Sequence, residues 1–194
     1  MSSVHPDAAR VYALLLAYTP KNEQEQSDRE QMLQYLQKGN AALTRDDLVA
    51  HFTASAWVCS KDRSRILMAY HNIYKAWAWL GGHADGDDDL QAVARREAQE
   101  ETGVQHLRLL QEEPVSIEVL TVAPHIKRGK FVSGHLHFNI TYLYEADYDD
   151  ALSVKEDENS AVGWRECARV IPDCNEEQMV PIYQKLMERM HDYK

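Results

Sequence analysis

Apolar residues near the N-terminus recur every three or four positions, which predicts a helix over residues 8–18. A polar stretch over residues 21–27 follows this helix. Asp28 then has the character of an N-cap for a second helix, which we expect to end near Gly39. We expect the two helices to form an extension, residues 1–48, that either packs on the main domain or offers a surface to a partner.

Short apolar runs separated by turn residues dominate the middle of the chain, a pattern that is typical of strands. The expected strands cover residues 52–59, 66–70, 115–122, 136–144 and 161–164. A further apolar run over residues 77–80 is expected to break at Gly81 and Gly82, because paired glycines favour a turn.

Two more helices complete the pattern. One is expected over residues 88–102 and ends at Gly103, since glycine readily adopts the left-handed conformation that closes a helix. The other is amphipathic and covers residues 176–191. Strands with helices before, between and after them predict an α/β domain over residues 49–194. A chain of 194 residues, 44% of them apolar, suits one such domain with an extension.

The charge of the chain limits the partners that it can bind. The formal net charge is −10 at pH 7, which disfavours general binding to nucleic acids and to anionic membranes. No apolar run approaches the ~20 residues that a membrane helix needs, and no signal segment opens the chain, so we expect a cytoplasmic protein. Three cysteines without a C-x-x-C pair predict reduced thiols. Bound metal ions would reconcile this acidity with an anionic substrate.

The predicted helix over residues 88–102 places three glutamates on its apolar face. Glu100 and Glu101 lie three and four residues after Glu97, so all three share a side with the apolar residues of the first turns. A solvated acidic face is the usual explanation of such residues. Against it, like charges repel, the C-terminal end of the helix dipole opposes anions, and burial of unpaired carboxylates is costly. A divalent cation such as Mg²⁺ or Mn²⁺ would offset these costs.

The spacing around this helix resembles the Nudix box. Gly82, five residues, Asp88, seven residues and then Arg96-Glu97-Ala98-Gln99-Glu100-Glu101-Thr102-Gly103-Val104 are similar to the family pattern of a glycine, a glutamate and R-E-U-x-E-E-x-G-U, where U is a bulky aliphatic residue. Asp88 replaces the glutamate of the pattern, and Ala98 replaces a larger aliphatic residue. The resemblance implies a Nudix-like α/β/α sandwich with a mixed β-sheet, preceded by the helical N-terminal extension found in some bacterial members.

The resemblance also implies a metal-dependent site. The expected ligands of Mg²⁺ or Mn²⁺ are Glu97, Glu100, Glu101 and the carbonyl of Gly81. Arg96 would orient a glutamate through a charge-assisted hydrogen bond. The general base would be either Glu97 or a carboxylate of the loop over residues 156–158, where Glu158 is the favoured choice. The alternative for that loop is an ordinary solvated run of charges.

Residues that select the substrate are expected outside the box. The candidate substrate-binding residues are His83, His135, His137, Lys127 and Trp79. His135 and His137 alternate on one expected strand and therefore face the same side, with His51 and His125 as candidates to join them. These histidines could donate hydrogen bonds to a substrate, hold a second metal or lie at an ordinary surface. The lysine could hold a terminal phosphate or form a hairpin tip, and the tryptophan could stack on a base or pack in the core.

The implied function is that of a hydrolase that cleaves a diphosphate linkage in a nucleoside diphosphate linked to another moiety. Its expected partner is a small-molecule nucleotide. The alternatives are a non-catalytic Nudix-fold sensor or protein-interaction module, and an acidic helix in an unrelated α/β domain. Isomerases of this fold need a cysteine near the box, and no cysteine lies between Cys59 and Cys167, so that reaction is excluded. The sequence leaves the oligomeric state open, a homodimer included.

Overall fold

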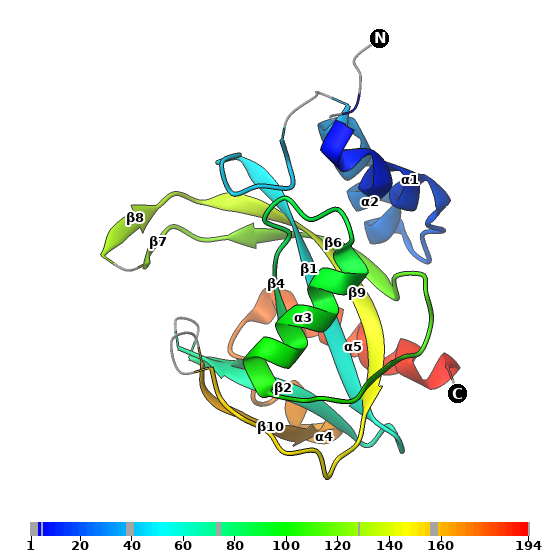
Figure 1. Cartoon of the computed structure of the whole chain (residues 1–194), viewed down its shortest axis with the longest axis vertical. Coiled ribbons are helices and arrows are strands. Elements are labelled where there is room, and N and C mark those ends of the chain that lie inside the picture. Colours follow the sequence, from blue (N-terminus) through cyan, green and yellow to red (C-terminus); the bar gives the residue numbers. More distant parts are fainter. Residues whose placement is uncertain are drawn as a thin grey trace. The chain divides into compact units, whose positions relative to one another are not determined.

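The computed structural model describes residues 4, 6–37, 41–72, 75–127, 129–155 and 159–193 (Figure 1). The chain divides into two compact units, each built from three segments. The first comprises residues 1–54, 82–93 and 116–140, and the second comprises residues 55–81, 94–115 and 141–194. Strands β1 (Ala50–Ser60), β4 (Leu80–His83) and β9 (His135–Ala146) and helix α3 (Leu90–Thr102) contribute residues to both units.

The remaining elements belong to one unit each. The first unit holds η1 (Pro6–Ala8), α1 (Ala9–Ala17), α2 (Glu23–Leu36), β6 (Ser116–Val122), β7 (His125–Lys127) and β8 (Lys130–Val132). The second unit holds β2 (Arg65–His71), β3 (Ala76–Ala78), β5 (Leu107–Leu109), β10 (Asn159–Glu166), α4 (Cys167–Val170), η2 (Glu177–Met179), α5 (Val180–Arg189) and η3 (Met190–Asp192). Among the helices of these described residues, none is long and apolar enough to cross a membrane.

Hydrogen bonds order the main strands as β10-β2-β1-β9-β5, with β3 on β2, β4 on β1 and β6 on β9. Strands β7 and β8 form a separate two-stranded sheet, in which Ile126 lies opposite Phe131. Helices precede, interrupt and follow these strands. The predicted α/β class with an N-terminal helical extension is therefore confirmed, and so are the five strands expected from the apolar runs.

In the first unit, helix α2 lies beside α1 and beside strand β6 (Figure 1). Its side chains satisfy the backbone of this strand: Asp28 Oδ2 accepts the N–H of Val119 at 2.9 Å, and Gln24 Nε2 donates to the carbonyl of Ile117 at 3.1 Å. Farther along α2, the ring of Tyr35 packs edge-on against Phe138, with ring centroids 5.1 Å apart. The extension thus covers polar groups at the margin of a strand, which would otherwise be open to pairing.

Some expected boundaries are wrong. Helix α2 begins at Glu23, five residues before the expected Asp28, because the side chain of Asn22 accepts the N–H of Glu25 and acts as the N-cap. The residue expected to end this helix, Gly39, lies outside the described residues. Gly81 and Gly82 do not break the apolar run but form part of β4. The short elements β5, β7, β8 and α4 were not expected, since three or four residues give no periodicity to detect.

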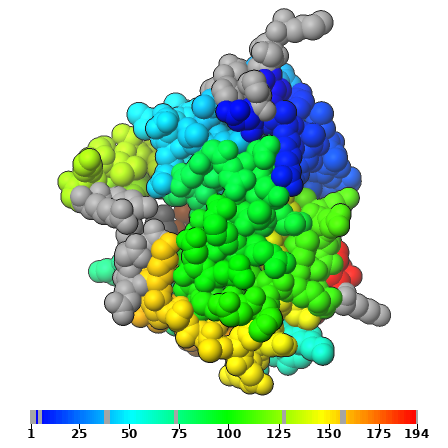
Figure 2. Space-filling model, in the orientation of Figure 1, coloured from blue at the N-terminus to red at the C-terminus, as the bar shows by residue number. Residues whose placement is uncertain are grey.

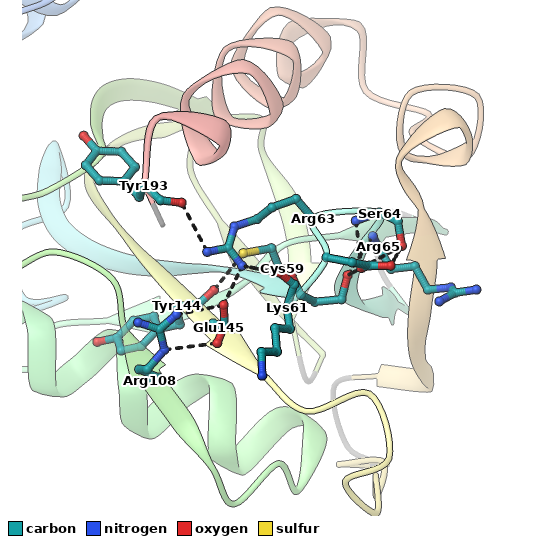
Figure 3. Close-up of polar contacts among 11 residues, drawn as sticks. Cys59, Lys61, Arg63, Ser64, Arg65, Arg108, Tyr144, Glu145 and Tyr193 are labelled. Carbon is teal, nitrogen blue, oxygen red and sulfur yellow. Dashed lines mark hydrogen bonds and ion pairs between the residues drawn. The ribbon is translucent and has the colours of Figure 1, made fainter.

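The second unit contains a buried ion pair between Arg63 and Glu145 (Figure 3). Arg63 Nη1 lies 2.6 Å from Glu145 Oε2, and the two side chains are only 10% and 12% exposed. Arg108 adds bonds of 3.0 and 2.9 Å to the same carboxylate, while Arg63 also donates to the carbonyl of Tyr193 at 3.3 Å. The turn after β1, strands β5 and β9, and the C-terminal segment are therefore joined through one network of charged groups.

Candidate active site

Helix α3 carries the three glutamates of the box, and its sequence explains its limits. Asp89 Oδ1 accepts the N–H of Ala92 at 3.0 Å, as a residue before a helix does when it caps the free amides. At the other end, Gly103 has φ +73° and its N–H donates to the carbonyl of Gln99, which confirms the expected left-handed closure. Leu90, Val93, Ala94 and Ala98 are buried. Figure 2 shows the outer side of the green segment that contains α3 at the molecular surface.

Glu101 is the most deeply placed of the three glutamates, with a relative exposure of 6%. Its Oε2 accepts the backbone N–H of Gly81 at 3.0 Å, and its Oε1 accepts from Asn159 Nδ2 at 3.3 Å. The end of α3 is thereby joined to β4 and to the start of β10, all within the second unit. The two donors therefore hold the buried carboxylate of Glu101 in a defined position.

Glu97 is half-buried and Glu100 is exposed, so the expectation that all three glutamates turn inward holds only in part. Lys155 Nζ lies 3.5 Å from Glu100 Oε2. Steps of three and four residues place Glu100 and Glu101 on opposite sides of Glu97 around the helix. One of them therefore reaches the interior while the other stays at the rim.

The donor chemistry of this group fits a hard divalent cation. Three carboxylates from one helical face, with a backbone carbonyl at Gly81, are the oxygen ligands that Mg²⁺ and Mn²⁺ prefer. Each glutamate nevertheless has its own partners, and the described side chains do not draw Glu97, Glu100 and Glu101 into one tight cluster. Like charges repel at this spacing, so separate partners stabilise the three side chains where they stand.

The structure describes one of the two other expected catalytic residues. Arg96 is exposed on α3. Glu158 lies outside the described residues. Its neighbour Asn159, which the sequence did not single out, donates to Glu101, as described above. A bond between residues 58 positions apart leaves no pattern in a single sequence, so neither Asn159 nor Lys155 could have been found from it.

Trp79 packs against helix α5. Its backbone N–H donates to the hydroxyl of Tyr183 at 3.1 Å, and the two rings meet edge-on with centroids 5.7 Å apart. Burial raises the pKa of Tyr183 above its ordinary value, so its hydroxyl stays protonated. Trp79 is half-buried, so part of its surface packs against other residues and part is exposed.

Four histidines gather in the first unit. His135 and His137 face the same side of β9 as expected, with their Nε2 atoms 3.2 Å apart. The ring of His51 lies 5.0 Å from each of them between centroids, and His83 lies 5.0 Å from His137. His125 is half-buried on β7, where its Nδ1 contacts the carbonyl of Ala123.

Burial lowers the pKa of His51, which is only 4% exposed, so the neutral imidazole is favoured. The ring of His51 on β1 lies close to His135 on β9 and to His83 on β4, so the group combines residues from three strands. Alternation along one strand could predict only the pair on β9. Lys127 ends β7 opposite Lys130 on β8, and its role in holding a terminal phosphate stays a prediction. The position of its side chain lies outside what the structure describes.

The family model described as the NUDIX domain matches residues 49–190. Among solved structures, the chain is similar to a Caenorhabditis elegans Ap4A hydrolase in a binary complex, with 18% identity and a TM-score of 0.55 over 73% of this chain and 98% of that chain. A NUDIX-family hydrolase from Clostridium perfringens has 17% identity and a TM-score of 0.53 over 72% and 97%. The NUDIX domain of Shewanella oneidensis NrtR complexed with ADP ribose has 18% identity and a TM-score of 0.51 over 72% and 87%. No curated protein matches the chain significantly.

The family model covers well over half of the chain, and the glutamates of α3 stand at the positions of the Nudix box. The chain therefore belongs to the NUDIX domain family. This membership supports the predicted class of enzyme, a Nudix-type pyrophosphohydrolase that acts on acid anhydrides, while the similar solved structures show the fold alone.

Proposed function

We propose that this Nudix protein uses Mg²⁺ or Mn²⁺ to hydrolyse the diphosphate linkage of a nucleoside diphosphate joined to a further group. The observation that carries the proposal is the buried carboxylate of Glu101, fixed by the Gly81 N–H and the Asn159 amide on a helix that also bears Glu97 and Glu100. Structures of similar fold, an Ap4A hydrolase and a NUDIX domain complexed with ADP ribose, motivate the nucleotide class.

The proposed ligands of the cation are Glu97, Glu100, Glu101 and the carbonyl of Gly81. When bound, the cation supplies positive charge that neutralises the diphosphate and acidifies water. This charge also explains how an anionic substrate approaches a chain of net charge −10.

Side chains of the protein then accept one proton from the attacking water. Water attacks a phosphorus atom, a base takes one proton from that water, and the bond from phosphorus to the bridging oxygen breaks, which leaves two phosphate groups. We assign the base to Glu97 or Glu158, of which the first is on α3 and half-buried. Arg96 is proposed to orient a glutamate, since a guanidinium binds a carboxylate with a strong, directed pair of hydrogen bonds.

The proposed contacts to the group beyond the diphosphate are those expected from the sequence, His83, His135, His137, Lys127 and Trp79. Residues that bind this group alone should change KM more than kcat when they are substituted. A Trp79→Leu variant is informative, because it keeps the apolar packing against Tyr183 and removes the large ring that could stack on a base.

The direct test is an assay of phosphate-containing products, with Mg²⁺ or Mn²⁺, across ADP-ribose, nucleoside triphosphates, dinucleoside polyphosphates and sugar nucleotides. We expect Glu101→Gln and Glu100→Gln to lower kcat/KM on the accepted substrate by about 100-fold or more, or roughly 2.7 kcal/mol in the barrier. Glu113→Gln, an exposed substitution outside the box, is the matched control and should keep wild-type activity. Binding of a nucleotide without any product would instead favour a sensor.

A further inference from the structure

We infer that His51, His83 and His137 form a second metal site, which binds one transition-metal ion such as Zn²⁺ through imidazole nitrogens. It is separate from the proposed metal site of the box, because its ligands are nitrogens and the box offers oxygens, although it shares His83 and His137 with the proposed substrate contacts. Imidazole suits Zn²⁺, Co²⁺ and Ni²⁺, whereas carboxylates and carbonyls suit Mg²⁺ and Mn²⁺. The two sites would therefore take different classes of ion.

The three histidines come together because backbone pairing in the first unit aligns the strands that carry them. The N–H of Leu136 donates to the carbonyl of Val49, and the N–H of Ala84 donates to the carbonyl of Phe52, both at 3.0 Å. These bonds set β9 and the end of β4 against the start of β1. One ring nitrogen from each of the three histidines lies within 4.8 Å of the others, and no other set of three histidine, cysteine or acidic side chains among the described residues meets this criterion.

The arrangement of the rings matches a tetrahedral ion. With a metal–nitrogen distance of about 2.0–2.1 Å, two imidazoles on one tetrahedral ion have centroids about 5.2 Å apart. The observed centroid distances are 5.2 Å for His51–His83, 5.0 Å for His51–His137 and 5.0 Å for His83–His137. The rings are tilted by 41°, 53° and 87°, so they do not form a stack. To share one tetrahedral ion, the three nitrogens must close from separations of up to 4.8 Å to about 3.3 Å.

His51 supplies the second, independent observation. Its Nδ1 lies 3.2 Å from the carbonyl of Asp47, which can only accept, so Nδ1 carries the proton and Nε2 carries the lone pair. The side chain is 4% exposed, and its buried Nε2 has no hydrogen-bond partner in the described structure. An unsatisfied buried polar atom costs about 1–3 kcal/mol. A carbonyl on one ring nitrogen with the other left for a ligand is how metal-binding histidines are usually held.

The surroundings hold this ligand in place. Asp47, whose carbonyl fixes His51, is itself held by the hydroxyl of Tyr35, 2.8 Å from each carboxylate oxygen. His135 borders the group: its Nδ1 faces the carbonyl of Ser133 at 2.9 Å, and its Nε2 lies 3.2 Å from that of His137. His135 does not belong to the set of ring nitrogens that lie within 4.8 Å of one another, so it is a neighbour of the site. Three protein ligands on a tetrahedral ion leave one position for water or a phosphate oxygen.

The test is a titration of the full chain with Co²⁺, after removal of any purification tag and of bound metal by a chelator, in the presence of millimolar Mg²⁺. We expect one Co²⁺ per chain, visible absorption bands of a four-coordinate ion without the near-ultraviolet band of a thiolate ligand, and complete displacement by Zn²⁺. One equivalent of Zn²⁺ should raise the melting temperature by about 5 °C or more. Absence of the visible absorption bands throughout this Co²⁺ titration overturns the proposal.

Variants separate this site from other nitrogen ligands. His83→Gln and His137→Gln, both at half-buried positions, should weaken Co²⁺ binding by about 100-fold or more. The matched control is His125→Gln, which removes a half-buried histidine of the same unit and should keep wild-type binding. Glu100→Gln should keep it as well, which distinguishes a failure here from a failure of the diphosphatase proposal. Unchanged Co²⁺ affinity in both His83→Gln and His137→Gln, with melting curves that show folded protein, contradicts the assignment.

Discussion

At the scale of single residues, backbone conformation and close contacts place the side chains of α3. Gly103 closes the helix with φ +73°, and a Cβ at this position would lie 2.3 Å from the Oγ of Ser153 and 3.0 Å from its backbone nitrogen. Gly129 has almost the same φ, +75°, but a Cβ there would meet no atom within 4 Å. The two glycines therefore separate the cost of the left-handed conformation from the cost of a clash.

We expect Gly103→Ala to lower the free energy of unfolding by about 2–4 kcal/mol, and Gly129→Ala by about 1 kcal/mol. The difference arises because only Gly103 has a neighbour too close for a methyl group. Urea unfolding followed by circular dichroism measures both values. Ser153→Ala in the Gly103→Ala background should restore part of the loss, since it removes the nearest atom. Equal losses for the two glycine variants would contradict this account.

Local residues also show what a single sequence can and cannot reveal. The glycine after α3 and the three glutamates were predictable, because their roles depend on positions within a few residues of one another. The partner of Glu101 on β10 was not, because it lies 58 residues away and an asparagine in a strand has no distinctive pattern. The N-cap of α2 was misassigned for another reason: Asn22 and Asp28 are both good caps, and only tertiary contacts decide between them.

At the scale of elements, α2 has a role that its amphipathicity alone does not suggest. The Asp28 side chain that was expected to start this helix instead accepts the N–H of Val119 on β6. Glu25 is fully buried, and its Oε1 accepts a hydrogen bond from the hydroxyl of Ser116 on β6 at 3.2 Å. The extension over residues 1–48 was predicted to pack or to bind a partner, and in the first unit its polar side chains bond a strand. We propose that packing is its role.

Removal of one of these bonds should be measurable. Asp28→Ala leaves the amide of Val119 without its acceptor, so we expect a loss of about 1–2 kcal/mol in the free energy of unfolding. Glu30→Ala is the matched control on the same helix, because Glu30 is exposed, and it should cost only a few tenths of a kcal/mol. Hydrogen exchange should show faster exchange at Val119 in the first variant alone. Unchanged protection at this amide would show that the contact does not stabilise the strand.

At the scale of the whole molecule, the sequence predicted the family and fold class better than the sites within them. The Nudix box has fixed spacing over 23 residues, so it could be read directly from Gly82 to Val104. The histidine group joins β1, β4 and β9, and the pairing of these strands is set by the sheet rather than by neighbouring residues. The same is true of the ion pair between Arg63 and Glu145, which are 82 residues apart. Long-range pairs of this kind determine how the stability of the chain responds to pH.

Burial opposes the charge on Glu145, but hydrogen bonds from Arg63 and Arg108 outweigh it and lower the pKa of this carboxyl below its ordinary value of 4.5 (Figure 3). A carboxyl whose pKa is lower in the folded state stabilises the protein fully above its unfolded pKa, and this stabilisation is lost as the pH falls through the folded pKa. We therefore expect the free energy of unfolding to decrease as the pH is lowered from about 5 towards 3.

Glu145→Gln tests this source of stability, because it removes the charge and keeps the shape of the side chain. The variant leaves Arg63, which is 10% exposed, without its carboxylate, so at pH 7 we expect a loss of about 2–3 kcal/mol. The decrease between pH 5 and pH 3 should also be shallower than in the wild type, since the titrating group is gone. Urea unfolding at a series of pH values measures both effects, and the exposed Glu113→Gln should show neither.

Parallel curves of unfolding free energy against pH for the wild type and Glu145→Gln would mean that other carboxyls govern the acid sensitivity. Asp173, whose pKa is lowered by Arg165 and Arg169 against the effect of burial, would then be the next residue to substitute.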